Sequence, residues 1–281
     1  MQKISWLLAG CVLAVPASAA SPASDDRAAW NRPFEPFRLY GNVWYVGTAG
    51  LSSFLITGPQ GHVLIDGGLP ESAPLIAANI RRLGFRPQDV KYLLINHAHV
   101  DHSGGLAELK RLTGATLIAS AGDRADLESG RVAGRPEIDP APPVKVDRLV
   151  GEGGTLRLGS NTLVAHMTPG HTRGCTSWSM RTAGKTILFA CSLSVAGQKL
   201  AGDPTYPRAA ADFRTTFTRL KAMKADIFVN FHAEGFDLAA KRAAQKAGKA
   251  NAFVDPTELA RQVRRAQAAF EKEAAMQRPR A

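Results

Sequence analysis

Leu94-Ile95-Asn96-His97-Ala98-His99-Val100-Asp101-His102-Ser103-Gly104-Gly105 places three histidines and one carboxylate within six consecutive positions. The stretch follows the aliphatic, β-branched run Val90–Ile95 and precedes Gly104–Thr113, whose apolar residues recur at helical spacing. The histidines therefore occupy a turn that leaves the carboxyl end of a strand. Open α/β sheets bind ligands at that end, so we expect a functional site here.

The spacing of these polar residues indicates metal binding. His97 and His99 are two positions apart, so an extended backbone directs both side chains to the same side. Asp101 and His102 follow in the tightening turn and can face a second point nearby. Imidazole nitrogen suits zinc, and the hard carboxylate oxygen suits a second zinc that shares a solvent ligand with the first. A polar loop with incidental histidines is the weaker alternative, because this cluster is much more specific than a lone histidine.

The amino-terminal segment predicts export. Met1–Ala20 combines one positive charge, an apolar core and the small residues Ala-Ser-Ala at 17–19, which is typical of a cleaved secretory signal too short to span a membrane. We therefore expect residues 21–281 to form one periplasmic domain that is not inserted in the membrane. Cys11 also resembles a lipoprotein processing site, although the apolar run continues past it.

The chain is basic, with 35 Lys and Arg against 24 Asp and Glu and a formal net charge of +11. Much of the excess lies on helical patterns from Lys241 onward, where solvated helix faces account for it. A nucleic-acid surface is the alternative, but an exported protein rarely meets nucleic acid. We therefore expect no nucleic-acid partner. The expected partner is a small-molecule substrate, and the expected oligomeric state is a monomer.

The chain before the histidine turn is predicted to consist mainly of strands joined by glycine turns. After the histidine turn, strands are predicted to alternate with helices. The predicted strands are Phe37–Tyr40, Val43–Gly47, Ser53–Thr57, His62–Asp66, Val90–Ile95, Ala115–Ala119, Thr155–Leu158, Asn161–Met167, Thr176–Thr182, Lys185–Cys191 and Ile227–Asn230. The predicted helices are Pro70–Leu83, Gly104–Thr113, Asp212–Met223, Asp237–Gly248 and Asp255–Gln277, and Gly122–Ser129 continues the alternation. Ser21–Pro36 is predicted to be an extended arm. The loop Gly130–Val146, with four prolines, is either a mobile lid or plain surface.

Two further histidines follow predicted strands. His171 and His232 both come after a strand end, so they are candidate ligands, whereas His62 and His166 lie inside strands and are not. Asp66 ends a strand before two glycines. It either caps that turn or orients a metal-bound histidine, and the residues alone favour neither role.

The hairpin formed by Thr176–Thr182 and Lys185–Cys191 predicts a disulfide. Pairing Thr182 with Lys185 across its tight turn brings Cys175 opposite or nearly opposite Cys191. In an exported protein this register favours a disulfide.

These residues resemble, in their order and spacing, the metallo-β-lactamase superfamily, and most closely the third subclass of class B β-lactamases. The resemblance spans nearly the whole mature chain and rests on Gly61–Gly67, Asn96–His102, Gly170–Thr172, Gly174–Thr176 and Cys191–Ser194. It implies an α/β fold of the αββα sandwich type, in which two mixed β-sheets are flanked by helices and a dinuclear zinc site lies on the sheet edges.

Carried over residue by residue, the resemblance implies two Zn²⁺ ions held by three ligands each. The first set is His97, His99 and His171, and the second is Asp101, His102 and His232. Asp101 would also be catalytic, holding the attacking water in line. Ser192 stands where other subclasses carry a zinc-binding cysteine, and here Ser192 and Ser194 would bind substrate. Lys199 is only a candidate partner for a substrate carboxylate. Asn96 departs from the family, in which serine or threonine is usual.

The function implied by the resemblance is that of a zinc-dependent β-lactamase. A water activated by the two ions would hydrolyse the amide of penicillins, cephalosporins and carbapenems and so confer antibiotic resistance. The alternative is another hydrolase of this fold, acting on a thioester, lactone or phosphodiester. Such relatives usually carry a metal-bridging aspartate near Cys191 and Ser192, and this chain has none there. A non-catalytic zinc-binding protein is a third possibility, but two sets of three ligands leave positions open for water.

Overall fold

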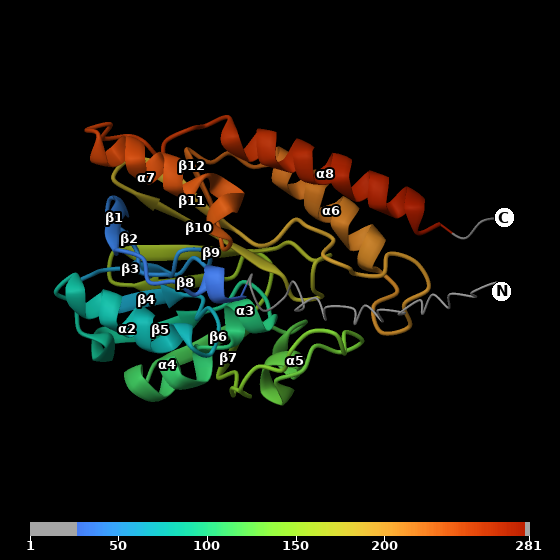
Figure 1. Cartoon of the computed structure of the whole chain (residues 1–281), viewed down its shortest axis with the longest axis horizontal. Helices are drawn as coiled ribbons and strands as arrows, with labels where there is room; N and C mark the ends of the chain where they lie inside the picture. The colour runs from blue at the N-terminus through green and yellow to red at the C-terminus, as the bar shows by residue number, and fades with distance from the viewer. Residues whose placement is uncertain (1–26, 279–281) are drawn as a thin grey trace, which may run out of the picture.

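The structure is a computed structural model that describes residues 27–278. Two β-sheets lie face to face between two outer layers of helices (Figure 1). This is the α/β sandwich with two mixed sheets that the sequence predicts. The predicted signal, Met1–Ala20, lies outside the described residues. Among residues 27–278, no helix is both long enough and apolar enough to cross a membrane.

The first sheet has seven strands in the order of the chain. They are β1 (Phe37–Tyr40), β2 (Val43–Tyr45), β3 (Phe54–Ile56), β4 (His62–Ile65), β5 (Val90–Leu94), β6 (Thr116–Ser120) and β7 (Arg148–Val150). Strands β1 to β4 form an antiparallel meander, and β4 to β7 run parallel. The carboxyl ends of β5 and β6 therefore lie at the same sheet edge.

The second sheet has five strands in the order β12-β11-β10-β9-β8. They are β8 (Thr155–Leu158), β9 (Asn161–Met167), β10 (Thr176–Thr182), β11 (Lys185–Ala190) and β12 (Ile227–Asn230). Neighbours pair antiparallel except β11 and β12, which are parallel. In the β10–β11 hairpin Thr182 pairs with Lys185, which is the register predicted from the sequence.

Helices cover the outer face of each sheet. In Figure 1 the first group lies below the seven-stranded sheet and the second lies above the five-stranded sheet. The first group is α2 (Ser72–Arg82), α4 (Leu106–Thr113) and α5 (Arg124–Ser129); the second is α6 (Ala209–Ala222), α7 (Leu238–Lys246) and α8 (Glu258–Met276). The short helix α3 (Val100–Ser103) follows β5, and the 3₁₀ turns are Pro87–Asp89 and Ala233–Phe236.

The larger hydrophobic core fills the space between the sheets and continues under α6 and α8. Phe54 of β3 and Phe189 of β11 join the two sheets, with ring centroids 5.2 Å apart. Phe213 and Phe217 on α6 pack against Phe270 on α8, at 5.1 and 5.5 Å between centroids. Each fully buried aromatic side chain contributes roughly 1.5–3 kcal/mol by leaving water. A smaller core lies between the seven-stranded sheet, α2 and α4.

Three details differ from the sequence predictions. Strand β7 and helix α3 were not predicted; β7 is a three-residue edge strand with mostly exposed side chains. The predicted extended arm Ser21–Pro36 is wrong for residues 27–30, which are helical, whereas residues 31–36 form no helix or strand. The Gly130–Val146 loop contains no helix or strand, as expected. It differs from the expected mobile lid or plain surface because it carries a buried arginine, Arg135.

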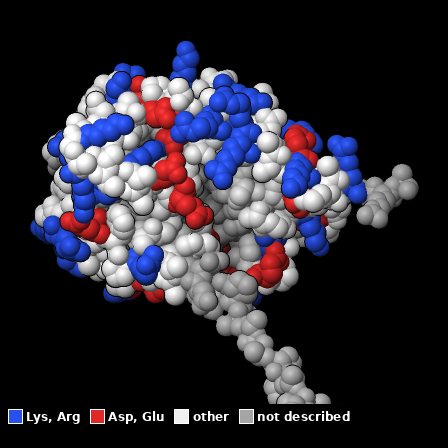
Figure 2. All heavy atoms as spheres, turned by 45° about the horizontal axis from the view of Figure 1, so that its top comes forward, with Lys and Arg blue, Asp and Glu red and all other residues white. Residues whose placement is uncertain are grey.

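Basic side chains gather on the face formed by α7 and α8, and a band of acidic side chains runs between them (Figure 2). Several of the cations are paired: Arg261 lies 3.1 Å from Asp255, and Lys246 lies 2.8 Å from Glu35. The excess positive charge is thus spread over solvated helix surfaces and interrupted by carboxylates, as the sequence suggests.

Candidate metal centre

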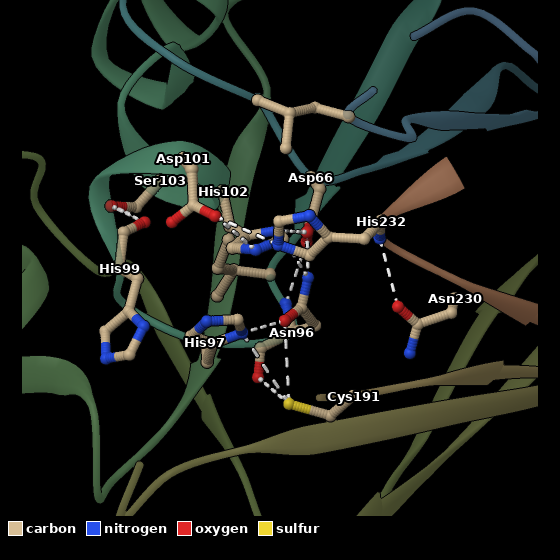
Figure 3. A network of polar contacts seen from close by, with 12 residues as sticks. Asp66, Asn96, His97, His99, Asp101, His102, Ser103, Cys191, Asn230 and His232 are labelled. Carbon is tan, nitrogen blue, oxygen red and sulfur yellow. Dashed lines mark hydrogen bonds and ion pairs between the residues drawn. The ribbon is translucent and has the colours of Figure 1, made fainter. Parts of the chain in front are cut away.

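Loops from both sheets meet at one edge of the sandwich. Residues 97–102 follow β5, residue 171 follows β9, residues 192–194 follow β11, and residue 232 follows β12. All six predicted ligands lie together at this edge, although they span 136 positions of the chain. Figure 3 shows most of this arrangement from close by.

Three histidines form the first group. The His171 Nε2 atom lies 3.1 Å from both His97 Nε2 and His99 Nδ1. Burial lowers the pKa of all three rings, that of His171 to about 4, so the rings are neutral and each can offer a lone pair. Three nitrogen donors facing one point, with space on the open side, match a zinc site that keeps a position for water.

Protein partners hold the outer nitrogens of two of these rings. His171 Nδ1 donates to the Ser194 carbonyl at 2.7 Å, and His97 Nδ1 contacts the Asn96 side-chain oxygen. Donation from Nδ1 places the lone pair on Nε2, which is the atom that faces the centre of the group. Such outer hydrogen bonds fix the tautomer and orientation of a ligating imidazole.

The second group gathers around one carboxylate. Asp101 Oδ2 lies 3.1 Å from both His102 Nε2 and His232 Nε2. Despite burial, which opposes ionisation, His102 and His232 hold the pKa of Asp101 well below its usual range. Again despite burial, contact with Asp101 and Asp66 raises the pKa of His102 to about 10. The carboxylates of this second group therefore favour a nearby positive charge. In the metal-free protein, protonated His102 carries that charge.

The contacts of Asp66 favour one of the two roles that the sequence left open, which is orienting a candidate metal ligand and not only capping a turn. Its Oδ2 atom lies 3.0 Å from His102 Nδ1, and its Oδ1 atom accepts a hydrogen bond from the Asn96 backbone N–H at 2.9 Å. The Asn96 side-chain amide also donates to Asp66 (Figure 3). Asp66 thus orients His102, and the Asn96 side chain connects Asp66 to His97.

The donor set fits zinc. His99 Nε2 and His102 Nε2 are buried and have no hydrogen-bond partner of good geometry within residues 27–278. For His102 this is the nitrogen that faces Asp101, so a metal ion that displaces its proton would meet an imidazole nitrogen and a carboxylate oxygen together. Five imidazoles and one carboxylate match the nitrogen and oxygen preferences of zinc.

A hollow of about 930 Å³ opens over both groups. Its wall includes Trp30, Ser192, Ser194, the end of β12 and one side of α8. The Ser192 and Ser194 hydroxyls lie 3.0 Å apart and face the same space. Lys199 is exposed and, within the described chain, is not part of this wall.

Asp123 braces the two ligand loops and was not predicted from the sequence. Its carboxylate accepts hydrogen bonds from the Ala98 N–H at 3.1 Å, the Thr172 hydroxyl at 2.9 Å and the Gly174 N–H at 2.8 Å. Ala98 lies between two candidate ligands, and Thr172 directly follows a third. The available signal was its position just after β6, at the same sheet edge.

Trp30 is a second residue that the sequence reasoning did not place in the site. Its ring meets the edge of His232 with 5.1 Å between centroids. The Asn230 side-chain oxygen accepts a hydrogen bond from the His232 backbone N–H at 3.0 Å (Figure 3). The Trp30 contact holds the His232 ring, and the Asn230 hydrogen bond holds the His232 backbone.

The predicted Cys175–Cys191 disulfide is confirmed, with 5.9 Å between the Cα atoms. Cys191 Sγ lies 3.3 Å from the Asn96 carbonyl oxygen, so the disulfide supports the turn that carries His97. Because its sulfur is bonded to Cys175, Cys191 is not a free thiolate ligand. His62 and His166, predicted to be non-ligands, belong to neither group and instead contact Phe85 and Ser179.

All six candidate ligands lie within the part of the chain that matches one family model. Residues 47–232 match the model described as the Metallo-beta-lactamase superfamily. Among curated proteins, a hydroxyacylglutathione hydrolase of Anaeromyxobacter dehalogenans is 30% identical over 171 residues, which are 60% of this chain and 56% of that protein. The N-acyl homoserine lactonase AttM of Agrobacterium fabrum is 31% identical, over 46% of this chain and 58% of that protein. This chain spans roughly a third to three fifths of the length of such curated relatives.

Solved structures match over nearly their full length. A Cronobacter sakazakii metallo-beta-lactamase with a HARLDQ motif is 45% identical with a TM-score of 0.87, covering 90% of this chain and 99% of that one. BJP-1, a subclass B3 metallo-beta-lactamase of Bradyrhizobium japonicum, is 43% identical with a TM-score of 0.84, covering 89% and 97%. FEZ-1 of Legionella gormanii is 38% identical with a TM-score of 0.85, covering 88% and 98%.

Proposed function

The chain belongs to the metallo-β-lactamase superfamily, and we propose that within it the protein is a dinuclear zinc β-lactamase of subclass B3 that hydrolyses penicillins, cephalosporins and carbapenems. The observation that carries this proposal is the full-length similarity to subclass B3 structures together with the two adjacent groups of donors. Residues 97–102 read His-Ala-His-Val-Asp-His and supply four of the six donors, and His171 and His232 supply the other two. Hydrolysis of these drugs would confer antibiotic resistance.

We assign one ion to His97, His99 and His171 and a second to Asp101, His102 and His232. When bound, two zinc ions supply Lewis acidity toward the amide carbonyl and lower the pKa of a coordinated water to roughly 7. The remaining chemistry belongs to side chains of this chain.

Asp101 is the catalytic side chain in this proposal. Its carboxylate stays ionised, and the His102 and His232 imidazoles hold it in place. One oxygen faces these imidazoles, which leaves the other to accept a hydrogen bond from the attacking water and to aim it at the carbonyl. This positioning needs no serine nucleophile, and the chain contains neither a GxSxG nor an SxxK pattern.

Ser192 and Ser194 are the proposed substrate-binding pair. Their hydroxyls lie together on the wall of the hollow, next to the first group of histidines. Two neighbouring hydroxyls can both donate to a substrate carboxylate and so orient the strained ring. The Ser194 carbonyl also holds His171, which couples the substrate wall to the metal group.

A thioester hydrolase is the second candidate, because several curated relatives are hydroxyacylglutathione hydrolases. Two observations weigh against it. These relatives match over much less of their length than the β-lactamase structures do. The Cys191–Ser194 segment also carries no carboxylate that could bridge two metals.

Export to the periplasm is part of the proposal. Met1–Ala20 would be removed as a signal, leaving residues 21–281 as the mature hydrolase domain. The Cys175–Cys191 disulfide supports this address, because disulfides persist in oxidising compartments.

The test is a substrate panel with zinc-loaded mature protein. Ring-opening absorbance is followed with a penicillin, a cephalosporin and a carbapenem, beside a glutathione thioester, an acyl-lactone and a phosphodiester. We expect turnover of all three β-lactams that a serine-directed inactivator does not block. Protein that ignores the β-lactams but cleaves one of the other substrates would move the assignment to that hydrolase class.

A further inference from the structure

Arg135 is a buried charged residue in a segment that is neither helix nor strand. It lies in the Gly130–Val146 loop, and its side chain is only 7% exposed. Its guanidinium donates to the Ala196 carbonyl at 2.7 Å and to the Gln198 side-chain oxygen at 3.3 Å, and its Nε contacts Glu137. A buried guanidinium is stable only when its donors are paired, so these contacts hold two loops together.

The second of these loops, residues 192–198, is part of the active-site wall. Residues 192–197 line the hollow above the metal centre, and the Ser194 carbonyl accepts the hydrogen bond from His171. A displacement of this loop would therefore change both the substrate wall and the partner of one candidate metal ligand.

The turn at the tip of this loop is intrinsically unfavourable. The Gln198 N–H donates to the Val195 carbonyl at 2.9 Å, and the central residues Ala196 and Gly197 have φ values of 45° and 76°. A turn with both central residues left-handed suits Asn-Gly or Gly-Gly, whereas alanine there is strained. Contacts from outside must hold this geometry.

Arg135 supplies that contact at the strained residue. Among the described residues, it is the only hydrogen-bond donor to the Ala196 carbonyl. Gln198 has further support, because its side chain donates to Asp203 at 3.1 Å and its carbonyl accepts from Gln277 at 3.2 Å. The turn is thus held at Gln198 without Arg135, whereas at Ala196 it is held by Arg135.

We propose that Arg135 is a positioning residue for substrate binding: it clamps the Ala196–Gly197 turn and so fixes the 192–198 wall of the active site. The effect on substrate rests on the proposed β-lactamase function, whereas the clamp itself does not. On this view the Gly130–Val146 loop is neither a mobile lid nor plain surface, and it acts as a fixed support for the substrate wall.

The test compares Arg135→Ala with Arg135→Lys and with Arg131→Ala as a matched control. Arg131 lies in the same loop, is exposed, and makes no side-chain hydrogen bond or ion pair within residues 27–278. Its removal changes the net charge by the same amount. Lysine at position 135 keeps the charge but cannot reach two acceptors with fork geometry.

Steady-state kinetics with a cephalosporin give the first readout. Because the turn loses a charge-assisted hydrogen bond, KM should rise roughly tenfold in Arg135→Ala, while kcat stays within about twofold. Arg135→Lys should fall between the alanine variant and wild type, and Arg131→Ala should match wild type. Millimolar methylguanidinium should lower the KM of Arg135→Ala by refilling the vacated site, an effect that a general loss of structure would not show.

Hydrogen–deuterium exchange of the metal-free protein gives a readout that does not depend on activity. Peptides covering residues 193–200 should exchange roughly tenfold faster in Arg135→Ala, while peptides from α2 stay unchanged and show that the fold is intact. Unchanged exchange in 193–200 together with an unchanged KM would overturn the clamp. Loss of protection in α2 as well would also overturn it in favour of a general stability role. If wild type itself ignores β-lactams, the proposed function fails, and the exchange data alone then decide the clamp.

Discussion

Reduction of the Cys175–Cys191 disulfide should lower the free energy of unfolding by a predictable amount. The bond closes a loop with a sequence separation of 16, and both residues are fully buried. For a loop of this length, the entropy model of the unfolded chain gives a loss of about 3 kcal/mol when the cross-link is removed. In a domain of this size, that corresponds to a fall in Tm of roughly 6–12 °C. Reduction keeps both sulfur atoms in place, so loss of packing adds little.

Urea unfolding of the metal-free mature protein, with and without a strong dithiol reductant, measures this loss. Metal-free protein is used because zinc bound to the native state would stabilise it by mass action and obscure the difference. The Cys175→Ser/Cys191→Ser double variant is the control, since its unfolding midpoint should not respond to reductant. Equal midpoints for oxidised and reduced wild type would refute the loop-closure reasoning. Two free thiols in unreduced, unfolded protein would show that the bond does not form.

Three further predictions concern the metal centre. Metal analysis of the mature protein should find two zinc ions per chain, and chelation should abolish hydrolysis; full activity with one tightly held ion would exclude the dinuclear arrangement. Asp101→Ala should reduce kcat strongly because it removes both a ligand and the group that orients water, whereas Ser192→Ala should cost only about 1 kcal/mol in kcat/KM. Equal losses in the two variants would argue against these roles. Asp66→Asn should weaken zinc binding at the second group by about 10–100-fold, as seen by competition with a chromophoric chelator, because His102 loses the carboxylate that orients it. Unchanged affinity would assign Asp66 to turn capping alone.

Local patterns were enough to predict most of the fold. The strands near the site were found to within one or two residues because alternating and aliphatic runs end at glycines or at the ligand turns. The disulfide followed from one hairpin register, since pairing Thr182 with Lys185 leaves little freedom for Cys175 and Cys191. Strand β7 was missed because its three mostly exposed residues are too few to show an alternating hydrophobic pattern. They form a strand because they pair with β6.

The supporting residues of the site could not be predicted in the same way. In the sequence, Asp123 looks like an ordinary polar residue near the start of the segment Gly122–Ser129, and Arg135 looks like an ordinary polar loop residue. Their importance comes from which loops meet in space: Asp123 joins the turns after β5 and β9, and Arg135 joins its own loop to the loop at residues 192–198 that lines the hollow. Helix α6 begins at Ala209, three residues before its predicted start, because Ala209–Ala211 have no hydrophobic period of their own.

The most direct test of the central claim is a crystal of zinc-loaded protein soaked with a carbapenem and measured at the zinc absorption edge. We expect two anomalous peaks, one among His97, His99 and His171 and the other among Asp101, His102 and His232. We also expect a ring-opened product whose carboxylate lies against Ser192 and Ser194. A single zinc peak, or two peaks with the intact drug bound away from these serines, would contradict the dinuclear β-lactamase proposal.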